Sequence, residues 1–414
     1  MDKPLNILLV HCHYRLAGGE DVVFADECAL LKAHGHHVTL YERRNDEATG
    51  AAAPAQKLLL PLRAVYNFQT VREVRALIRQ NHIDLVHVHN TLLVISPSVL
   101  RAAQAEGVPV VQTLHNFRLF CPSGVLLRHG QVCEDCPRHS LLCAVRHRCY
   151  RGSLAQSAVC AAVYGFHRLL GSYRHVDLIA LTEFDRQKLL EFNTHRPVFD
   201  PARLFVKPNM VRLDGADAAA PLPLTQRKNQ IVFAGRLEEL KGLRTAIEAW
   251  NLLKQDAGGS AAPELIVCGI GPLQDWARQA AAGANVSFRG QVSHAALHAL
   301  LAESRAALAP SLCYESFALV PAEAHALGTP VLASDLGNVG AAVREGVDGL
   351  HFAPGDPAAL ADAVRRLNAA AQAMDPAAMR KNALAAFAPE ENYRRLMAIY
   401  RKILARQTPG KENP

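Results

Sequence analysis

The stretch that decides the fold is LAPSLCYESFALVPAEAHALGTPVLAS, residues 308–334. An apolar run over residues 306–309 ends in a Pro-Ser pair, which predicts a buried strand that finishes there. Small residues then predict a helix over about residues 317–327, and a Gly-Thr-Pro sequence separates it from the next strand. Strand, loop, helix and strand in this order predict a parallel unit with its ligand edge at the carboxyl ends of the strands.

Two carboxylates in this stretch point to a ligand. Glu315 lies in the loop and Glu323 in the helix, and their separation is at most about 12 Å along a helix axis. This spacing suits the two ends of a nucleotide-sugar, whose diphosphate would lie against the helix N-terminus. A favourable contact with the helix dipole explains Glu315 equally well. It does not explain Glu323, which lies among Ala, His and Leu, because a buried acid needs a partner.

A pair of cations follows the first predicted strand of the second half, in FAGRLEELKG, residues 233–242. Arg236 leaves the strand end, and Lys241 precedes the next helix. An arginine fork and a lysine point charge beside a strand edge can hold a diphosphate. On this segment alone, surface pairs with Glu238 and Glu239 are an equally good interpretation. Together with the two carboxylates, the diphosphate clamp is the better one.

These segments resemble the signature of the retaining glycosyltransferases of family 4, which have the GT-B fold. The matching residues are Gly-Arg-Leu and Lys-Gly in one segment, and Pro-Ser, Glu, seven residues, Glu-Ala and Gly-x-Pro-Val in the other. Ser316 and Ala318 stand where that family usually has glycine, and both are small enough for a phosphate to approach the backbone. The resemblance implies an α/β fold of GT-B type, with two Rossmann-like doubly wound domains facing a central cleft.

The resemblance also implies the residues of the site. The implied catalytic residues are Glu315, His115, Arg236 and Lys241, and the implied donor-binding residues are Gly18, Gly19, Gly235, Arg236, Lys241, Gly269, Gly271, Phe317, Ala318, Leu319 and Glu323. In that family the first Glu contacts sugar hydroxyls near the anomeric carbon and the second contacts the ribose, while Arg and Lys neutralise the departing diphosphate. The sequence has no Asp-x-Asp motif, so neither a catalytic metal nor a cofactor is expected.

Two glycine turns and one histidine admit other interpretations on the residues alone. The Gly-Gly pair before the helix that starts near Asp21 can face a phosphate. The Gly-Ile-Gly turn at residues 269–271 can meet a base or a ribose or be a plain tight turn, and it lacks the third glycine of a dinucleotide fingerprint. His115 ends a strand, where an imidazole can relay a proton, and His87 and His89 compete with it for that role.

Strand-like runs alternate with helical patterns in both halves, which predicts two doubly wound α/β domains. The predicted strands are residues 6–10, 37–41, 85–89, 108–113 and 178–181, then 230–234, 264–268, 286–289, 306–309 and 331–333. The predicted parts are an acceptor-side domain over residues 1–212, a linker over 213–228, a nucleotide-sugar domain over 229–388 and a last helix over 389–407. In the resembling family this helix crosses back to the first domain, whereas the sequence alone equally allows packing within the second.

Five of the ten cysteines fall within residues 121–149, inside a segment over residues 118–151 that has six Arg against two acids. A Cys-x-x-Cys pair there has zinc-knuckle spacing, but no second pair accompanies it. A structural zinc would use Cys121, Cys133, Cys136 and Cys149, and neighbouring Arg would lower the pKa of their thiols. Reduced, unligated thiols are the favoured alternative. We interpret the segment as an insertion that grips an anionic acceptor.

The chain has 414 residues, of which 50% are hydrophobic and 20% charged, and this is enough for two globular domains. Its net charge of +7 is concentrated in residues 1–214, which carry 25 Lys and Arg against 19 Asp and Glu, a net +6. This suggests an anionic partner such as a phospholipid surface, although a solubilising excess is an equal interpretation. Nucleic acid is not expected, because aromatics do not interleave the basic residues. We expect a cytoplasmic protein, peripheral on the inner face of the cytoplasmic membrane, because no signal peptide or spanning segment is visible.

These observations predict a retaining, metal-independent hexosyltransferase. Its donor would be a nucleotide-diphosphate sugar, with uridine or guanosine as the base, and its acceptor an anionic lipid-linked or glycan molecule of bacterial surface-polysaccharide biosynthesis. One alternative is a nucleotide-sugar epimerase or phosphorylase-like enzyme of the same fold, although no obvious context for a pyridoxal phosphate lysine appears. The other is a non-catalytic subunit that binds a sugar nucleotide or a lipid pyrophosphate, against which the intact acid and cation pairs argue.

Overall fold

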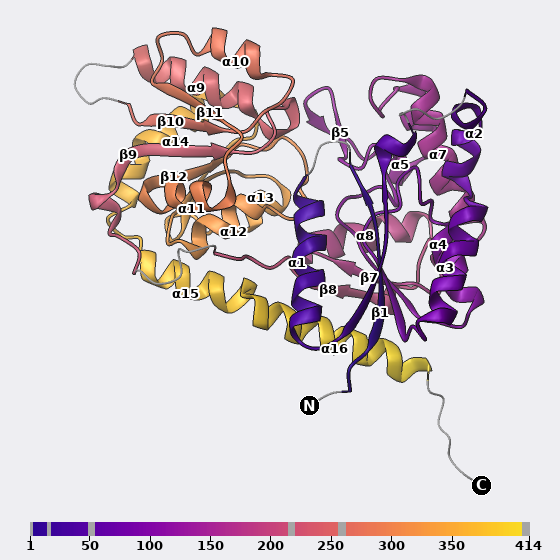
Figure 1. The fold of residues 1–414 in the computed structure, drawn as a ribbon. Coiled ribbons are helices and arrows are strands. Elements are labelled where there is room, and N and C mark those ends of the chain that lie inside the picture. The colour runs from indigo at the N-terminus through magenta and orange to yellow at the C-terminus, as the bar shows by residue number, and fades with distance from the viewer. Residues whose placement is uncertain (1–2, 15–17, 49–53, 214–219, 256–261, 408–414) are drawn as a thin grey trace. The chain divides into compact units, whose positions relative to one another are not determined.

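The computed structural model describes residues 3–14, 18–48, 54–213, 220–255 and 262–407. The chain forms two compact units, each built around its own sheet (Figure 1). The first unit comprises Met1–Val125, Glu134–Met210 and Asn392–Pro414, and the second comprises Leu126–Cys133 and Val211–Glu391. The short segment Leu126–Cys133 contains a two-stranded antiparallel hairpin of β5 (Leu127–Arg128) and β6 (Gln131–Val132).

The first unit contains a parallel sheet of six strands in the order β2-β1-β3-β4-β7-β8. The strands are β1 (Asn6–His13), β2 (His37–Arg44), β3 (Leu85–Val88), β4 (Val110–Thr113), β7 (Asp177–Ala180) and β8 (Leu204–Val206). Apart from the last helix of the chain, the α-helices of this unit are α1 (Gly19–Ala33), α2 (Pro54–Val65), α3 (Phe68–Gln80), α4 (Ser98–Ala105), α5 (Asp135–Arg138), α6 (Leu142–Arg146), α7 (Leu154–Leu169) and α8 (Glu183–His195), with 3-10 turns at Asn45–Ala48 and Pro201–Arg203. Every residue of β3 and β7 is buried, as expected for parallel strands covered by helices on both faces.

The second unit repeats this plan with the strand order β11-β10-β9-β12-β13-β14, again all parallel. The strands are β9 (Lys228–Ala234), β10 (Glu264–Cys268), β11 (Val286–Gly290), β12 (Ser304–Ala309), β13 (Val331–Ser334) and β14 (Gly349–Phe352). The helices are α9 (Leu243–Gln255), α10 (Gln274–Ala280), α11 (His294–Glu303), α12 (Leu319–Ala326), α13 (Gly337–Ala341), α14 (Pro357–Ala370) and α15 (Pro376–Phe387), with 3-10 turns at Leu224–Gln226 and Glu239–Lys241. Two apolar clusters lie on opposite faces of this sheet, because successive side chains of β9 alternate between them.

The predicted fold class of two Rossmann-like doubly wound domains is confirmed. Each of the ten predicted strands overlaps an observed one. In the two large sheets the prediction missed β8 and β14, which have only three and four residues, and it also missed the two-residue strands β5 and β6. A strand this short shows no periodicity of its own, and β14 also begins with a glycine.

The last helix, α16 (Pro389–Gln407), begins and ends where the sequence predicts. From Asn392 onward it belongs to the first unit. Its residues Leu396, Tyr400 and Ile403 pack in one cluster with Ile7 of β1. The apolar face seen in the sequence therefore contributes to the core beneath the first sheet.

Among the described residues, each helix is too short or too polar to cross a lipid bilayer.

Candidate functional site

The carboxyl end of the second sheet brings together one predicted cation and one predicted acid. Lys241 Nζ donates to Glu315 Oε2 across 2.7 Å, and Ser311 Oγ donates to the other carboxylate oxygen. Asn338 Nδ2 donates to the backbone carbonyls of Glu315 and Ser316, which fixes the loop that carries the acid. Glu315 is thus held at its side chain and its backbone by residues that follow three different strands.

The charge state of Lys241 follows from this contact. Burial alone would lower the pKa of its ammonium, but the adjacent Glu315 carboxylate outweighs burial and raises it. Lys241 is therefore a fixed cation at neutral pH. About a third of its side chain remains exposed, so an anionic ligand can reach it.

Arg236 follows β9 and does not join this pair among the contacts of the described residues. More than half of its side chain is exposed, and its guanidinium pairs with Glu238. This contact is the surface pair that the sequence offered as the other interpretation. A diphosphate contact by Arg236 stays a prediction.

The predicted glycine turns serve first to bring loops together. Gly269 follows β10 with φ of 140°, and a Cβ there would lie 1.8 Å from the carbonyl oxygen of Gly235, which follows β9. A Cβ on Gly271 would lie 2.6 Å from the carbonyl oxygen of Leu237. The loops after β9 and β10 therefore pack backbone against backbone, and only glycine allows this distance.

The N-terminus of α12 presents backbone rather than side chains. The helix begins at Leu319, and its N-cap residue, Ala318, makes no side-chain hydrogen bond to the first helical amides. Phe317 turns its ring into the apolar cluster, 5.6 Å from the ring of Phe387. Because Phe317 packs into the core, the backbone amides are what this segment offers to a phosphate at the helix start, and the donor-binding role of residues 317–319 stays a prediction.

Glu323 is buried within α12, and two histidines of α11 lie near its carboxylate. Its Oε1 lies 3.8 Å from Nδ1 of His294 and 3.8 Å from Nε2 of His298. Both ring nitrogens of the buried His298 have no hydrogen-bond partner among the described residues. These distances are longer than a hydrogen bond, so the imidazoles are neighbours of the acid and do not supply the partner that it needs. The sequence analysis named neither histidine, although a His pair at i and i+4 was visible in residues 294–298.

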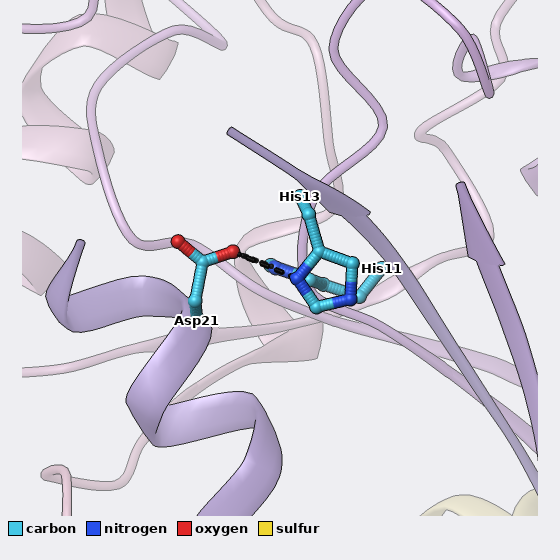
Figure 2. A group of neighbouring side chains, drawn as sticks. All are labelled: His11, His13 and Asp21. Atoms are coloured by element: carbon cyan, nitrogen blue, oxygen red, sulfur yellow. Dashed lines mark hydrogen bonds and ion pairs between the residues drawn. The ribbon is translucent and has the colours of Figure 1, made fainter. Parts of the chain in front are cut away.

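In the first unit, the glycine pair lies where α1 begins. Gly18 precedes the helix, Gly19 is its first residue, and the Gly18 amide donates to Asp21 Oδ2 across 2.8 Å. The same carboxylate contacts His11 and His13 of β1 (Figure 2). Asp21 therefore already occupies one of the two amides that the sequence analysis assigned to a phosphate.

His115 follows β4 and lines a small pocket together with Asn116, Arg118 and Tyr164. Its Nε2 lies 2.9 Å from Nδ1 of His89. Burial holds the pKa of His115 well below its usual range, and the neighbouring imidazoles lower it further. His115 is thus neutral at pH 7, which is the state that can accept a proton or a hydrogen bond.

Family models match both units of the chain. Residues 17–214 match the model described as Glycosyltransferase Family 4, and residues 228–369 match the one described as Glycosyl transferases group 1. The chain belongs to the glycosyltransferases of family 4.

Similar proteins support this membership of family 4. Glycogen synthase of Mycobacterium tuberculosis is 40% identical over 161 residues, which are 38% of this chain and 37% of the relative, so the chain spans little more than a third of that protein. D-inositol 3-phosphate glycosyltransferase 1 of Catenulispora acidiphila is 27% identical over 342 residues, 78% of this chain and 72% of the relative. The crystal structure of Anabaena Alr3699/HepE in complex with UDP-glucose has a TM-score of 0.63 at 17% identity, covering 97% of this chain and 100% of that one, which supports the GT-B fold.

Beneath His115, this family 4 glycosyltransferase contains a buried polar cluster that the sequence analysis missed. Glu27 of α1 is fully buried, and its carboxylate lies 2.9 Å from Lys207 Nζ, 2.9 Å from His87 Nδ1 and 3.3 Å from His89 Nε2. Burial would raise the pKa of Glu27, but Lys207 and His87 outweigh it and hold the pKa well below its usual range. No sequence signal predicted this cluster, because its members are separated by as many as 180 positions.

The cysteine segment does not present a metal site in the described residues. Among all the described residues, three groups of side chains are close enough to hold a metal ion, and none of the three includes a cysteine. Cys121, Cys136 and Cys149 belong to the first unit and Cys133 to the second. Burial and the neighbouring cysteines raise the pKa of Cys136, so the expectation that Arg would lower it is wrong for this thiol. A structural zinc on these four residues stays a hypothesis.

Proposed function

We propose that this chain transfers a sugar from a nucleotide-diphosphate sugar to an acceptor with retention of the anomeric configuration and without a catalytic metal. Uridine- and guanosine-diphosphate sugars are the first donors to test. Membership of family 4 supports the reaction class. The Anabaena structure was solved with UDP-glucose, which supports a donor of this chemistry.

The observation that carries the proposal is the contact of Lys241 with Glu315. The ammonium and the carboxylate lie 2.7 Å apart at the edge of the second sheet, and α12 starts four residues after the acid with an uncapped N-terminus. A diphosphate placed there would meet one fixed cation and the amides of a helix start, while the carboxylate would face the attached sugar. This arrangement supplies charge stabilisation where a leaving diphosphate develops negative charge.

The chemistry then needs little from protein bases. The bond between the anomeric carbon and the diphosphate oxygen breaks, and a bond to the acceptor oxygen forms on the same face of the sugar. The acceptor proton passes to the leaving phosphate oxygen. Lys241 and Arg236 would hold the diphosphate charge, Glu315 the sugar hydroxyls, and Glu323 the ribose. In the first unit, Gly18, Gly19 and His115 are the residues we assign to the donor phosphate or the acceptor.

For the acceptor we propose an anionic, lipid-linked or glycan molecule at the inner face of the cytoplasmic membrane. The net +6 of residues 1–214 supports an anionic partner. One relative is named for D-inositol 3-phosphate, a phosphorylated acceptor. The pathway we propose is surface-polysaccharide assembly.

Thermal-shift screening against uridine-, guanosine- and adenosine-diphosphate sugars tests the donor, because a ligand of the native state raises the melting temperature. Transfer of a radiolabelled sugar from the best donor to a membrane fraction then tests the reaction. We expect Glu315→Gln and Lys241→Ala to lose transfer while retaining the fold. Donor binding without transfer to any acceptor would instead support a binding subunit, and conversion of the free nucleotide-sugar would support an epimerase.

A further inference from the structure

Two histidines and an aspartate converge at the carboxyl end of β1, next to Gly18, which we assign to the donor phosphate or the acceptor. His11 and His13 are two residues apart on the strand, so their side chains lie on the same face, which α1 covers. Asp21 comes from the first turn of α1 and points at both rings (Figure 2). His11 Nε2 lies 2.9 Å and His13 Nδ1 3.0 Å from the same oxygen, Asp21 Oδ1.

His13 lies between two carboxylates. Its Nδ1 faces Asp21, and its Nε2 lies 2.7 Å from Glu42 Oε1 on the neighbouring strand β2. A neutral imidazole has one N–H, so it can donate to only one of these acids and would turn a lone pair toward the other. The geometry is satisfied either by a doubly protonated ring or by a proton on Nε2 and a metal ion at Nδ1.

The position of the proton on the His11 ring depends on what its two nitrogens, Nδ1 and Nε2, contact. His11 is fully buried, and its Nδ1 has no hydrogen-bond partner among the described residues. Without a metal ion, the Asp21 carboxylate favours the proton on His11 Nε2, which then donates to Oδ1. A metal ion at Nε2 would move the proton to Nδ1, where no described group competes for it. With the proton on Nδ1, His11 Nε2, His13 Nδ1 and Asp21 Oδ1 would each offer a lone pair to one ion.

The separations of these donors suit one transition-metal ion. All three atoms lie within 4.8 Å of one another. Zinc binds imidazole nitrogen and carboxylate oxygen at about 2.0–2.2 Å, so two ligands of a tetrahedral ion lie roughly 3.3–3.6 Å apart. The observed 2.9 and 3.0 Å would have to lengthen by about 0.3–0.7 Å. His13 and Asp21 are partly exposed, which leaves a route for the ion and room for water ligands.

The groups around these donors match the usual surroundings of a metal ligand. A ligating histidine commonly donates its other N–H to a carboxylate, and Glu42 takes this place for His13. The second oxygen of Asp21 accepts from the Gly18 amide, which fixes the carboxylate. A metal ion here would therefore tie β1 to the turn before α1.

Two other donor groups are weaker candidates. Glu27, His87 and His89 are fully buried, and the Lys207 ammonium already supplies the cation that Glu27 needs. His294, His298 and Glu323 form the third group, but the contacts of Glu323 are 3.8 Å long, and we assign this acid to the donor ribose.

We propose that His11, His13 and Asp21 form a structural binding site for one divalent transition-metal ion, zinc first, which clamps the Gly18 turn to the end of β1. The ion would fix the position of Gly18 and take no part in the bond-breaking or bond-forming steps of the sugar transfer. Imidazole and carboxylate donors in this combination favour zinc, cobalt or nickel over calcium or magnesium.

Titration of the full chain with Co²⁺ and Zn²⁺ after EDTA treatment and desalting tests the proposal. Calorimetry gives the number of equivalents, and the Co²⁺ spectrum separates this site from cysteine, because only thiolates add an intense charge-transfer absorption. We expect one equivalent that binds without thiolate absorption and raises the melting temperature. Asp21→Asn and His13→Gln should remove this equivalent.

Two further variants keep the test independent of folding. Glu42→Gln, outside the donor set, should weaken Co²⁺ binding by about 10- to 100-fold and leave the stoichiometry unchanged. His37→Gln, an exposed histidine on β2, should change neither value. Equal Co²⁺ affinity in the wild type, Asp21→Asn and Glu42→Gln would overturn the proposal, and so would binding seen only with thiolate absorption. His13 would then be a doubly protonated imidazole between two acids.

Discussion

Lys241 Nζ donates to Glu315 Oε2 across 2.7 Å, although 74 positions separate the two residues in the chain. The lysine ends the turn after β9, and the acid lies in the loop after β12, so the contact exists because these two strands are neighbours in the sheet. A cation and an acid that are already in contact can each take a different part of one ligand without a large rearrangement. Preorganised charge of this kind is what lowers the barrier for a leaving diphosphate.

Lys241→Ala should therefore lower the rate of transfer more than it lowers donor affinity. We expect a fall in kcat of about 10²-fold, the usual loss when one stabilising group is removed from a charge-developing site. Arg244→Ala is the matched control, since Arg244 is a half-buried cation of α9 that pairs with Glu239 and stacks on Trp276. Steady-state kinetics with the best donor measures both. An unchanged kcat in Lys241→Ala would remove Lys241 from the site.

Glu323→Gln should act on binding of the nucleotide rather than on turnover. The buried carboxylate is the group that we assign to the ribose hydroxyls, and hydrogen bonds to a charged group contribute about 1.5–3 kcal/mol. We therefore expect the donor Kd to rise by about 10- to 100-fold, measured by calorimetry with the nucleoside diphosphate. Glu303→Gln, an acid at the end of α11 that pairs with Lys228, should leave the Kd unchanged. Wild-type affinity in Glu323→Gln would rule out the ribose role.

Local patterns made the fold and half of the site predictable. The strand, loop, helix and strand around Glu315 were visible because their signals, an apolar run, a Pro-Ser stop and a Gly-Thr-Pro sequence, lie within 30 residues. Strands β8 and β14 were missed because a strand of three or four residues shows no periodicity of apolar residues. The contact of Lys241 with Glu315 depends on β9 and β12 being neighbours in the sheet, and the sequence analysis predicted no strand order.

Other parts of the site could not be predicted because they depend on contacts between distant residues. Glu27 and Lys207 meet in the core although 180 positions separate them, and neither sequence context suggests a buried charge. Gly18 was assigned to a phosphate because a glycine at a helix start is free to bind one. The structure shows that Asp21 binds its amide, and no periodicity argument predicts which side chain occupies an amide.

Gly269→Ala should destabilise the second unit more than an ordinary glycine substitution. A Cβ at this position would lie 1.8 Å from the Gly235 carbonyl oxygen, so one of the two loops must move. Gly290→Ala is the matched control, because Gly290 also has positive φ, 67°, but a Cβ there meets no atom within 4 Å. We expect a loss in unfolding free energy of about 3 kcal/mol or more for Gly269→Ala and about 1–2 kcal/mol for the control. Equal losses by urea denaturation would show that the two loops adapt.

The stability of the protein should fall as the pH decreases from about 6.5 to 4. Burial lowers the pKa of His89 and of His167 to about 4 in the folded protein, against 6.5 in the unfolded chain. Above pH 6.5 both rings are neutral in the folded and in the unfolded protein. Below pH 6.5 the rings take up protons in the unfolded protein but stay neutral in the folded protein. Each ring therefore contributes a loss of about 1.4 kcal/mol per pH unit in this window. Urea denaturation from pH 7 to 4.5 measures the slope.

Replacing one of these histidines separates its contribution from the rest. His167→Gln should reduce the pH slope by about half of the combined effect of the two rings, while His37→Gln, which changes an exposed ring, should not alter it. A slope that is the same in the wild type and in His167→Gln would mean that this imidazole takes up its proton without unfolding.

Lys207→Met tests the buried pair with Glu27. The two charges lie 2.9 Å apart and are almost completely excluded from solvent. Removing the ammonium leaves the buried carboxylate with only the imidazoles of His87 and His89 beside it, and we expect a loss of about 3–5 kcal/mol of unfolding free energy. The double variant Lys207→Met/Glu27→Gln removes both charges and should recover most of that loss. A double variant as unstable as Lys207→Met alone would show that packing, rather than charge, accounts for the effect.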